Sequence, residues 1–436
     1  MTQATAVETA DGRDYDAVVV GASLAGCATA ILLGRAGARV ALVEQRTDPA
    51  AYKRICSHYI QSSALPALER LGLLEPMIEA GAVRSGIRIH VPAGWILPPE
   101  DSSLAGVNLR RELLDPLIRS TAAATPGVEL LAGRTVEELI CADGAVQGVV
   151  ARDTAGERLR LTARLVVGAD GRGSRIAKLA GVRSRRVRHG RVAYGAYFQG
   201  APPAGAPTAS LWMLDPDMAA AFPTDGDLTF YAVMPVKERA GAFREDPGAA
   251  LVEALQALPD APPVAAGTMV GKPQGKLDMT NEANVPVAPG LALVGDAALA
   301  IDPLWGVGCG WALQSAEWLA DSVTPALLGS EPLARGLRRY RRRHRRALRG
   351  HAVMMYDYAG GRRFRPVERM LFSAATHDAG VARIMEAFGS RRIGPARMML
   401  TATPRAALAR LRRRLGGLGR TSVSAPGREG SPRAAS

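Results

Sequence analysis

With 436 residues, 47% of them hydrophobic, the chain can bury a large core, and its length predicts two to three domains. Residues 1–13 are polar, and no apolar run of about 18 residues lacks glycine, so we expect neither a secretory leader nor a membrane span. Its four cysteines show no C-x-x-C or zinc-ligand spacing, which argues against a metal site and a disulfide reductase and fits a cytoplasmic protein. The net charge of +14 leaves nucleic-acid binding to be weighed.

The first glycine cluster, GASLAG at 21–26, lies between a strand and a helix. The β-branched run 15–20 predicts a buried strand, 26–37 a helix and 38–43 a second strand, the context that a dinucleotide fingerprint requires. Gly21 permits a tight turn and Gly26 close packing, whereas Ser23 replaces the middle glycine and could donate to a phosphate. Glu44 is placed to accept hydrogen bonds from a ribose. The residues expected to hold this end of a dinucleotide are Gly21, Ser23, Leu24, Ala25, Gly26, Glu44 and Gln45.

The second cluster, GADG at 168–171, ends the apolar strand 165–167 and precedes a helix that begins near Ser174. Asp170 and Gly171 could hold one part of the same ligand, although ordinary capping of the helix explains them equally well. Between the first two clusters, residues 62–82 are predicted to be helical.

Residues 185–288 are predicted to be rich in β-structure. Apolar residues alternate over 192–198 and 228–234, which indicates an antiparallel sheet with one apolar face that forms a roof over the ligand. The apolar strands at 211–214 and 230–234 favour an aromatic or polycyclic substrate, but core packing would explain them as well.

The third cluster, VGDAALAIDPLWGVGCG at 294–310, follows the predicted strand 291–294. Asp296 at the carboxyl end of that strand can accept hydrogen bonds from sugar-like hydroxyls. Pro303 and the glycines at 306, 308 and 310 predict a loop of little bulk that leads into a helix at 311–319. The positive end of that helix would favour negative charge on a flat ring lying against the loop.

With these motifs in this order, the chain resembles the FAD-dependent aromatic hydroxylases, single-component flavoprotein monooxygenases of the p-hydroxybenzoate hydroxylase fold. The resemblance extends over about residues 14–350 and includes an R-x-x-L helix that begins at Arg111. It implies an α/β fold: a Rossmann-like FAD-binding domain with a parallel sheet, a β-rich substrate domain and C-terminal helices. The further FAD-binding residues that it implies are Arg54, Arg111, Val136, Asp170, Gly171, Gly295, Asp296, Pro303, Gly306, Gly308, Cys309 and Gly310.

The resemblance also implies a reaction. NAD(P)H would reduce FAD, O2 would add at flavin C4a, and the hydroperoxide would hydroxylate or epoxidise an apolar small molecule of aromatic or polycyclic character. No catalytic side chain or metal is required. Trp305 is a candidate substrate wall or a packing residue, and His58 a candidate general base or a packing residue. The histidine that follows Ala-Ala in many relatives is Leu299 here, and the absence of a second G-x-G-x-x-G means that NAD(P)H would bind without a Rossmann domain of its own.

Three other functions remain open. A reductase of the geranylgeranyl reductase type shares the G-D-A-x-x-x-x-D-P phrase at 295–303 but would saturate an alkene without O2; its Y-x-W-x-F-P-like segment is absent. A flavin-dependent halogenase would need a W-x-W-x-I-P segment, which is also absent. A basic binding protein would carry no flavin and would bind polyanions in a salt-sensitive manner.

The arginine run 337–346 is better explained by a solvated helix than by nucleic-acid binding. Leu337, Tyr340, His344, Ala347 and Leu348 have helical spacing and would form its inner face. A second basic amphipathic helix is expected near residues 408–415. The predicted organisation is a flexible N-terminus at 1–13, an FAD-binding domain at 14–184 and 289–330, a β-rich substrate domain at 185–288, a helical region at 331–415 and a disordered tail at 416–436. The oligomeric state cannot be predicted.

Overall fold

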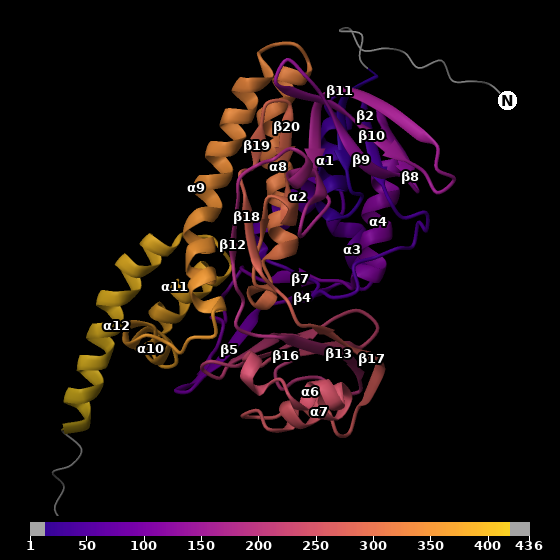
Figure 1. Cartoon of the computed structure of the whole chain (residues 1–436). Helices are drawn as coiled ribbons and strands as arrows, with labels where there is room; N and C mark the ends of the chain where they lie inside the picture. Colours follow the sequence, from indigo (N-terminus) through magenta and orange to yellow (C-terminus); the bar gives the residue numbers. More distant parts are fainter. Residues whose placement is uncertain (1–13, 419–436) are drawn as a thin grey trace, which may run out of the picture.

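The computed structural model describes residues 14–418, and its upper part in Figure 1 is a sheet with a parallel centre, flanked by helices. The expectations for residues 1–13 and for the tail from 419 onward lie outside the described residues; residues 416–418 end the last helix. The main sheet has the strand order β19-β20-β11-β1-β2-β8; the first half of β11 extends beyond it and pairs antiparallel with β10, which pairs with β9. The strands of the main sheet and of this extension are β1 (Tyr15–Val20), β2 (Val40–Glu44), β8 (Val128–Ala132), β9 (Thr135–Ala142), β10 (Ala145–Arg152), β11 (Arg158–Gly168), β19 (Val287–Ala288) and β20 (Leu291–Leu293).

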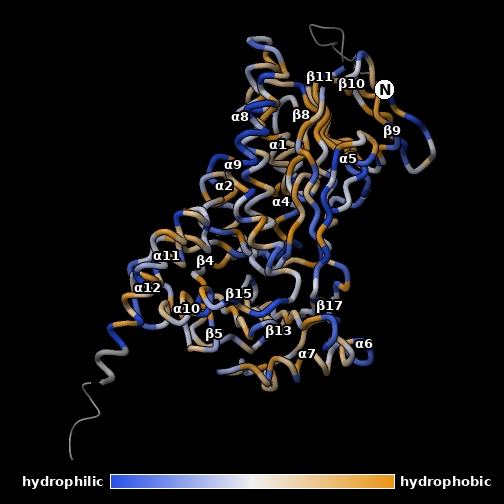
Figure 2. Tube along the Cα trace, turned by 60° about the vertical axis from the view of Figure 1, so that its left-hand side comes forward, coloured by the Kyte–Doolittle hydropathy of each residue, from blue (hydrophilic) through white to orange (hydrophobic). Residues whose placement is uncertain are grey.

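Both faces of the main sheet are buried, which accounts for its uninterrupted apolar strands. On one face, Val19 and Leu42 pack with helices α1 (Leu24–Arg35), α4 (Arg111–Ala123) and α8 (Gly308–Leu327). On the other, Val18 and Ala41 pack against β9, β10 and α5 (Arg175–Leu179). Figure 2 shows these strands as a continuous hydrophobic band. The predicted strand–helix–strand unit at the start of the chain is confirmed, and β1 pairs in parallel with both β2 and β11.

A second, seven-stranded sheet lies below the first in Figure 1, and we call it the roof sheet. Its order is β17-β13-β16-β15-β14-β5-β6, so it recruits two strands that precede residue 185 in the sequence. The strands are β5 (Ile87–Val91), β6 (Gly94–Ile96), β13 (Ala193–Gln199), β14 (Ala209–Met213), β15 (Met218–Pro223), β16 (Leu228–Met234) and β17 (Thr268–Lys276).

The strands predicted at 192–198 and 228–234 correspond to β13 and β16, and they pair antiparallel as expected. The roof sheet departs from the expectation in two other respects. Strand β14 pairs in parallel with β5, and β14, β15 and β16 are buried at every position. One face packs against α6 (Ala242–Glu245) and α7 (Pro247–Gln256), where Trp212 and Tyr231 are buried. The other face, with Leu211 and Phe230, packs on Tyr59 of the FAD-binding part of the chain. Because both faces are covered, alternating polar residues are not needed.

The remaining elements connect these layers. Residues 62–82 are helical as expected, and two small sheets, β12-β18-β21 and β3-β7-β4, lie between the main and roof sheets. The strands of these two sheets are β3 (Tyr59–Ile60), β4 (Val83–Ser85), β7 (Gly106–Asn108), β12 (Ser184–Val187), β18 (Asn281–Asn284) and β21 (Leu299–Ala300). The connecting helices are η1 (Ser62–Ala64), α2 (Leu65–Leu71), α3 (Leu74–Glu79), η2 (Lys237–Arg239), η3 (Gly295–Ala297) and η4 (Pro303–Trp305).

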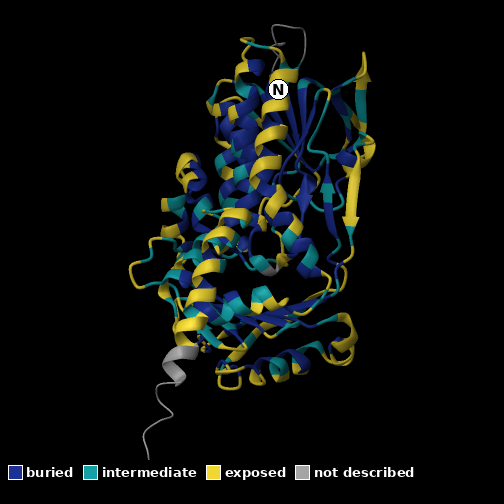
Figure 3. Cartoon of the chain, turned by 90° about the vertical axis from the view of Figure 1, so that its left-hand side faces the viewer, coloured by how far each residue is buried: buried dark blue, intermediate teal, exposed yellow. Residues whose placement is uncertain are grey.

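The helical C-terminal region is formed by α9 (Leu333–Ala359), α10 (Pro366–Ala375), α11 (Ala379–Gly389) and α12 (Pro395–Leu418). On α9, Leu337, Tyr340, His344 and Leu348 are buried as predicted, but Ala347 is exposed. The arginines lie on the outer face, where Arg343 pairs with Asp321 of α8 at 2.8 Å. The alternating buried and exposed stripes of these helices are visible in Figure 3. The outer face is therefore a solvated, partly ion-paired surface. No helix within residues 14–418 is long and apolar enough to cross a membrane.

Burial of His344 in α9 predicts a pH-dependent stability. Desolvation lowers the pKa of His344 to about 4, from an ordinary 6.5, and its Nε2 has no hydrogen-bond partner among the described residues. As the pH falls from about 6.5 to about 4, the unfolded chain binds a proton that the folded chain excludes, so stability is lost through this window. We expect His344→Leu to reduce the loss of unfolding free energy between pH 7.5 and pH 5 by about 2 kcal/mol.

Urea unfolding of both proteins at the two pH values measures this difference. The matched control is His377→Leu, since His377 is exposed on the surface. An equal pH dependence in the His344→Leu variant and the parent would contradict the prediction.

Candidate active site

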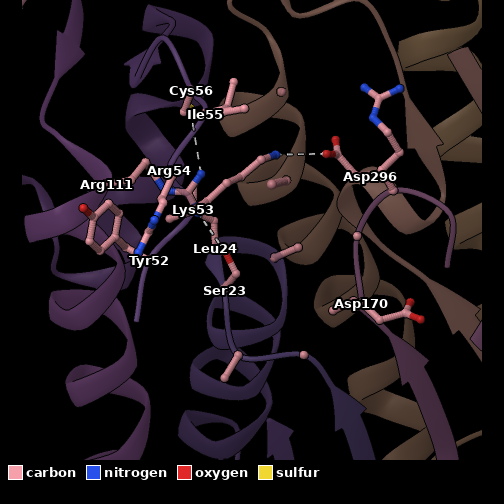
Figure 4. Close-up of a pocket in the computed structure, with 18 of the residues that line it drawn as sticks. Ser23, Leu24, Tyr52, Lys53, Arg54, Ile55, Cys56, Arg111, Asp170 and Asp296 are labelled. Atoms are coloured by element: carbon pink, nitrogen blue, oxygen red, sulfur yellow. Dashed lines mark hydrogen bonds and ion pairs between the residues drawn. The ribbon is translucent and has the colours of Figure 1, made fainter. Parts of the chain in front are cut away.

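A cavity of about 950 Å³ opens at the carboxyl ends of β1, β2 and β11 and extends to the start of α8. This is the edge of a parallel sheet where dinucleotides bind. Figure 4 shows side chains from the connection between β2 and β3 (residues 45–58), which we call the strap, together with Ser23, Asp170 and Asp296. The predicted residues that line the cavity are Gly21, Ser23, Leu24, Ala25, Glu44, Gln45, Arg54, Arg111, Val136, Asp170, Gly171, Asp296, Pro303, Gly306, Gly308 and Cys309.

The turn between β1 and α1 requires glycine at two positions. Gly21 has φ +105°, and a Cβ there would lie 2.6 Å from the carbonyl oxygen of Ala169. A Cβ on Gly26 would lie 1.8 Å from the carbonyl oxygen of Gly21. Gly26 therefore supports the cavity from behind without lining it. The carboxylate of Glu44 accepts from the N–H of Ala22 at 2.8 Å and still faces the cavity, so it both braces the turn and offers a lone pair to a ligand.

Ser23, the departure from the fingerprint, belongs to a buried polar network. Arg111 donates to Ser23 Oγ at 2.7 Å and forms an ion pair with Asp115 at 2.6 Å. Burial opposes the charge on Arg111, but Asp115 outweighs it and raises the pKa of the guanidinium. Because Ser23 Oγ accepts from Arg111, its own hydrogen is free to donate into the cavity.

Asp170 has a structural function as well as a place in the cavity wall. Its carboxylate accepts from Ser174 Oγ at 2.6 Å and from the N–H of Ile176 at 3.0 Å, and Ser174 caps α5. The capping alternative is therefore present in the structure. Gly171, with φ +80°, has nothing within 4 Å of where a Cβ would lie, and it faces the cavity.

Lys53 and Asp296 face each other across the cavity, as Figure 4 shows. Lys53 Nζ lies 3.2 Å from Asp296 Oδ2, which raises the pKa of the lysine. Although burial opposes ionisation of Asp296, Lys53 and Arg172 hold the pKa of its carboxyl below the ordinary value. Asp296 is therefore a carboxylate at neutral pH, able to accept hydrogen bonds from hydroxyls. Lys53 was not identified from the sequence because a single lysine in an arginine-rich chain carries no pattern.

Two predicted glycines of the third cluster, Gly295 and Gly310, do not line the cavity but pack directly behind the residues that do. Gly295 has φ +58° and a Cβ there would lie 2.9 Å from that of Ala25. Gly310 packs next to the Arg391 guanidinium. The expected loop is also shorter than predicted: α8 begins at Gly308, so Gly308 and Gly310 belong to its first turn. Their small size lets this turn approach its neighbours closely.

Trp305 and His58 do not line the cavity. Trp305 is half-buried between the main core and the helical region, with its ring 6.1 Å from that of Tyr358. His58 is buried; its Nδ1 accepts from the N–H of Arg111 and its Nε2 bonds to Tyr197 Oη. Burial lowers the pKa of His58 to about 4. With both ring nitrogens engaged, this geometry favours a structural function for His58 over that of a general base.

A buried charged cluster beside the cavity was missed. His189 Nε2 lies 2.9 Å from Asp302 Oδ2, and Arg191 lies 3.8 Å from the same oxygen; all three side chains are fully buried. Asp302 lines the cavity immediately before Pro303. His189 and Arg191 come from the segment that leads into the roof sheet, so the cluster ties the roof to the Pro303 loop. The sequence separation of these residues explains why no local pattern revealed them.

Two cysteines also meet at the cavity. Cys56 Sγ and Cys309 Sγ lie 3.6 Å apart, although 253 positions separate them in the sequence. Arg111 Nη1 lies 3.9 Å from the first sulfur and 3.8 Å from the second. A search for C-x-x-C spacing cannot detect a pair that only the tertiary fold creates.

The cavity fits FAD by its own chemistry. The tight glycine turn at one end precedes the N-terminus of α1, which offers free N–H groups to a pyrophosphate. Lysine and arginine side chains outnumber carboxylates along the wall, which suits an anionic ligand. At the other end, Gly306 and the first turn of α8 leave backbone accessible to a flat ring.

Comparisons with known proteins agree with this fit. A family model described as an FAD binding domain matches residues 14–355. The chain is 35% identical over 193 residues to 6-methylpretetramide 4-monooxygenase from Streptomyces rimosus, covering 41% of this chain and 43% of that enzyme. It is 26% identical over 341 residues to digeranylgeranylglycerophospholipid reductase from Methanothrix thermoacetophila, covering 76% and 83%. The fold is similar to that of p-nitrophenol 4-monooxygenase from Pseudomonas putida DLL-E4, with a TM-score of 0.71, 21% identity, and coverage of 87% and 98%.

Since the family model spans most of the chain, the protein belongs to the FAD-binding family of aromatic hydroxylases and related flavoprotein monooxygenases. It is an FAD-dependent oxidoreductase with the expected α/β fold. The first of these relatives is matched over less than half of its length, and the structural likeness bears on the fold alone.

Proposed function

We propose that the protein uses NAD(P)H and O2 to hydroxylate or epoxidise an apolar, aromatic or polycyclic small molecule. The observation that carries this proposal is one cavity that begins at the glycine turn, passes Asp296 and ends at the Pro303–Gly308 loop beneath the roof sheet. Relatives named as monooxygenases support the oxygenation. We also propose that NAD(P)H approaches from solvent, since the sequence offers no second dinucleotide fingerprint, and that the enzyme acts in the cytoplasm.

The proposed cofactor contacts follow the length of the cavity. Glu44 would hold the adenosine ribose, the N–H groups at the start of α1 the pyrophosphate, and Asp296 the ribityl hydroxyls. Ser23 would donate its free hydroxyl hydrogen to a phosphate oxygen while Arg111 fixes its orientation. Gln45, Arg54 and Val136 complete the adenine and pyrophosphate ends.

When bound and reduced, FAD supplies the activation of O2. The protein would supply orientation and exclusion of water. The inner face of the roof sheet, with Leu211, Phe222 and Phe230, is buried against Tyr59, and Tyr59 itself lines the cavity. The buried pair of His189 and Asp302 would keep that loop in place as substrate enters. An apolar enclosure of this kind protects a reactive oxygen species from loss to water.

A reductase is the second candidate, because the aligned region of digeranylgeranylglycerophospholipid reductase covers 83% of that enzyme. Such a reductase would use the same FAD cavity. Its reaction differs in the fate of the electrons, which would reach an alkene instead of O2.

The two functions are separated by one experiment. We expect NADH or NADPH to bleach the bound flavin under anaerobic conditions, and ¹⁸O2 to restore its colour with incorporation of one ¹⁸O atom into an aromatic substrate. Aromatic and polycyclic compounds would be screened by their acceleration of flavin reduction, with mass spectrometry of the product. Oxidation of the reduced flavin by a polyprenyl alkene in the absence of O2, with no labelled product in its presence, would identify the reductase instead.

A further inference from the structure

Cys56 and Cys309 form a thiol pair at the point where the strap crosses the cavity. Cys56 lies on the strap, and Cys309 lies in the first turn of α8, next to the proposed flavin ring site. Their sulfur atoms are 3.6 Å apart, so a movement of about 1.5 Å would bring them to disulfide distance. The other two cysteines lie elsewhere: Cys27 is buried within α1, and Cys141 is exposed at the end of β9.

The surroundings make one member of the pair the nucleophile. A hydrogen bond joins the two sulfur atoms, and together with the nearby cations Arg111 and Lys53 it lowers the pKa of the Cys56 thiol well below its ordinary value. The same hydrogen bond raises the pKa of Cys309. Cys56 is therefore the thiolate, and Cys309 stands ready as the resolving thiol. A thiolate near cations with a second thiol in reach is the arrangement of redox-sensitive cysteines.

Side-chain contacts rather than regular secondary structure hold the strap in place. It has no helix or strand of its own, and Lys53, Arg54 and Ile55 at its centre are exposed. The N–H of Lys53 donates to Asp115, and Arg119 donates to the carbonyl of Ala51 at 2.7 Å. An irregular segment opens locally at lower free energy than the helices and strands of a core. Release of a cofactor that lies beneath it would require such opening.

We propose that Cys56 and Cys309 are a site of reversible oxidation, and that their disulfide locks the strap over the FAD cavity. Hydrogen peroxide, which flavoenzymes produce when reduced flavin meets O2 without substrate, is the oxidant. The Cys56 thiolate attacks one peroxide oxygen to give a sulfenic acid and hydroxide. Cys309 then attacks the Cys56 sulfur, the S–S bond forms, and water leaves; overall, two thiols and one H2O2 give one disulfide and two waters. A small-molecule dithiol reverses the reaction.

The cross-link itself does not depend on the cofactor, whereas its effect on FAD rests on the proposed function. Holoenzyme would be treated with H2O2, alkylated with N-ethylmaleimide under denaturing conditions and digested for mass spectrometry. We expect a Cys56–Cys309 peptide and a release of FAD, followed by its fluorescence after dilution, that is about tenfold slower than from reduced protein. Dithiothreitol should restore the original rate.

The variants distinguish this cross-link from general oxidation. Cys56→Ser and Cys309→Ser should each abolish the cross-linked peptide and the effect of peroxide on FAD release. Cys141→Ser, the matched control at the exposed cysteine, should retain both. A cross-link that contains Cys141, over-oxidised Cys56 without a cross-link, or an unchanged FAD release rate in cross-linked protein would each overturn the proposal. A protein that takes up no FAD would instead refute the proposed function, because the cross-link is still measurable.

Discussion

Gly26→Ala is expected to destroy the cofactor site and to cost at least about 2 kcal/mol of folding free energy. The added methyl group would lie 1.8 Å from the carbonyl oxygen of Gly21, and the nearest atoms in its path are mostly backbone. Helix α1 would have to move away from β1, and its N-terminal N–H groups would move with it. We therefore expect purified Gly26→Ala protein to be colourless and to unfold at lower urea concentration than the parent.

The control for this substitution is Gly389→Ala at the end of α11. Gly389 has nothing within 4 Å of where a Cβ would lie, so the same chemical change should leave flavin content and urea midpoint unchanged. Flavin absorbance per protein and a urea titration measure the two effects. A yellow Gly26→Ala protein of parental stability would mean that the turn is not packed as described.

Asp296→Ala is expected to weaken FAD binding by at least about 30-fold with little change in stability. Charge-assisted hydrogen bonds to a carboxylate contribute about 1.5 to 3 kcal/mol each, and about 1.4 kcal/mol corresponds to tenfold in affinity. The stability effect should be small because the partner, Lys53, is half exposed and can turn to water. Asp296→Asn keeps the ability to form hydrogen bonds but loses the charge, so its loss of FAD affinity should be intermediate.

Titration of apo-protein with FAD, followed by quenching of flavin fluorescence, measures the affinity. Glu331→Ala serves as the control, because it removes an ion pair with Arg339 on α9, on the surface of another part of the chain. If the Asp296→Ala and Glu331→Ala proteins bound FAD equally well, Asp296 would not contact the cofactor.

The FAD-binding elements could be predicted because each of them is defined by neighbouring residues in the sequence. The apolar run of β1, the glycine turn and the helix of α1 are contiguous in the sequence, and hydrophobic periodicity with turn chemistry defines each of them. The same is true of the strand that leads to Gly295 and Asp296. The arginine face of α9 also followed from helical spacing alone.

What could not be predicted depends on contacts between distant segments. Cys56 meets Cys309, and His189 meets Asp302, only because the roof sheet, the strap and α8 converge on one cavity. The strand β5 joins the roof through parallel pairing with β14, and no periodicity encodes a partner that far along the chain. Burial of His58 between Arg111 and Tyr197 likewise arises from three separate segments.

The two covered faces of the roof sheet bear on how this catalyst could be redesigned. Successive residues of β16 alternate between the layer of α6 and α7, where Tyr231 points, and the layer packed on Tyr59, where Phe230 and Ala232 point; Tyr59 itself lines the cavity. Libraries of substitutions at the residues packed on Tyr59, which include Leu211 and Phe222, should change the substrate selectivity of the enzyme. Substitution libraries restricted to the residues that face α6 and α7 should change thermal stability and leave substrate selectivity unchanged. Alternate residues of one strand would therefore control stability and selectivity separately.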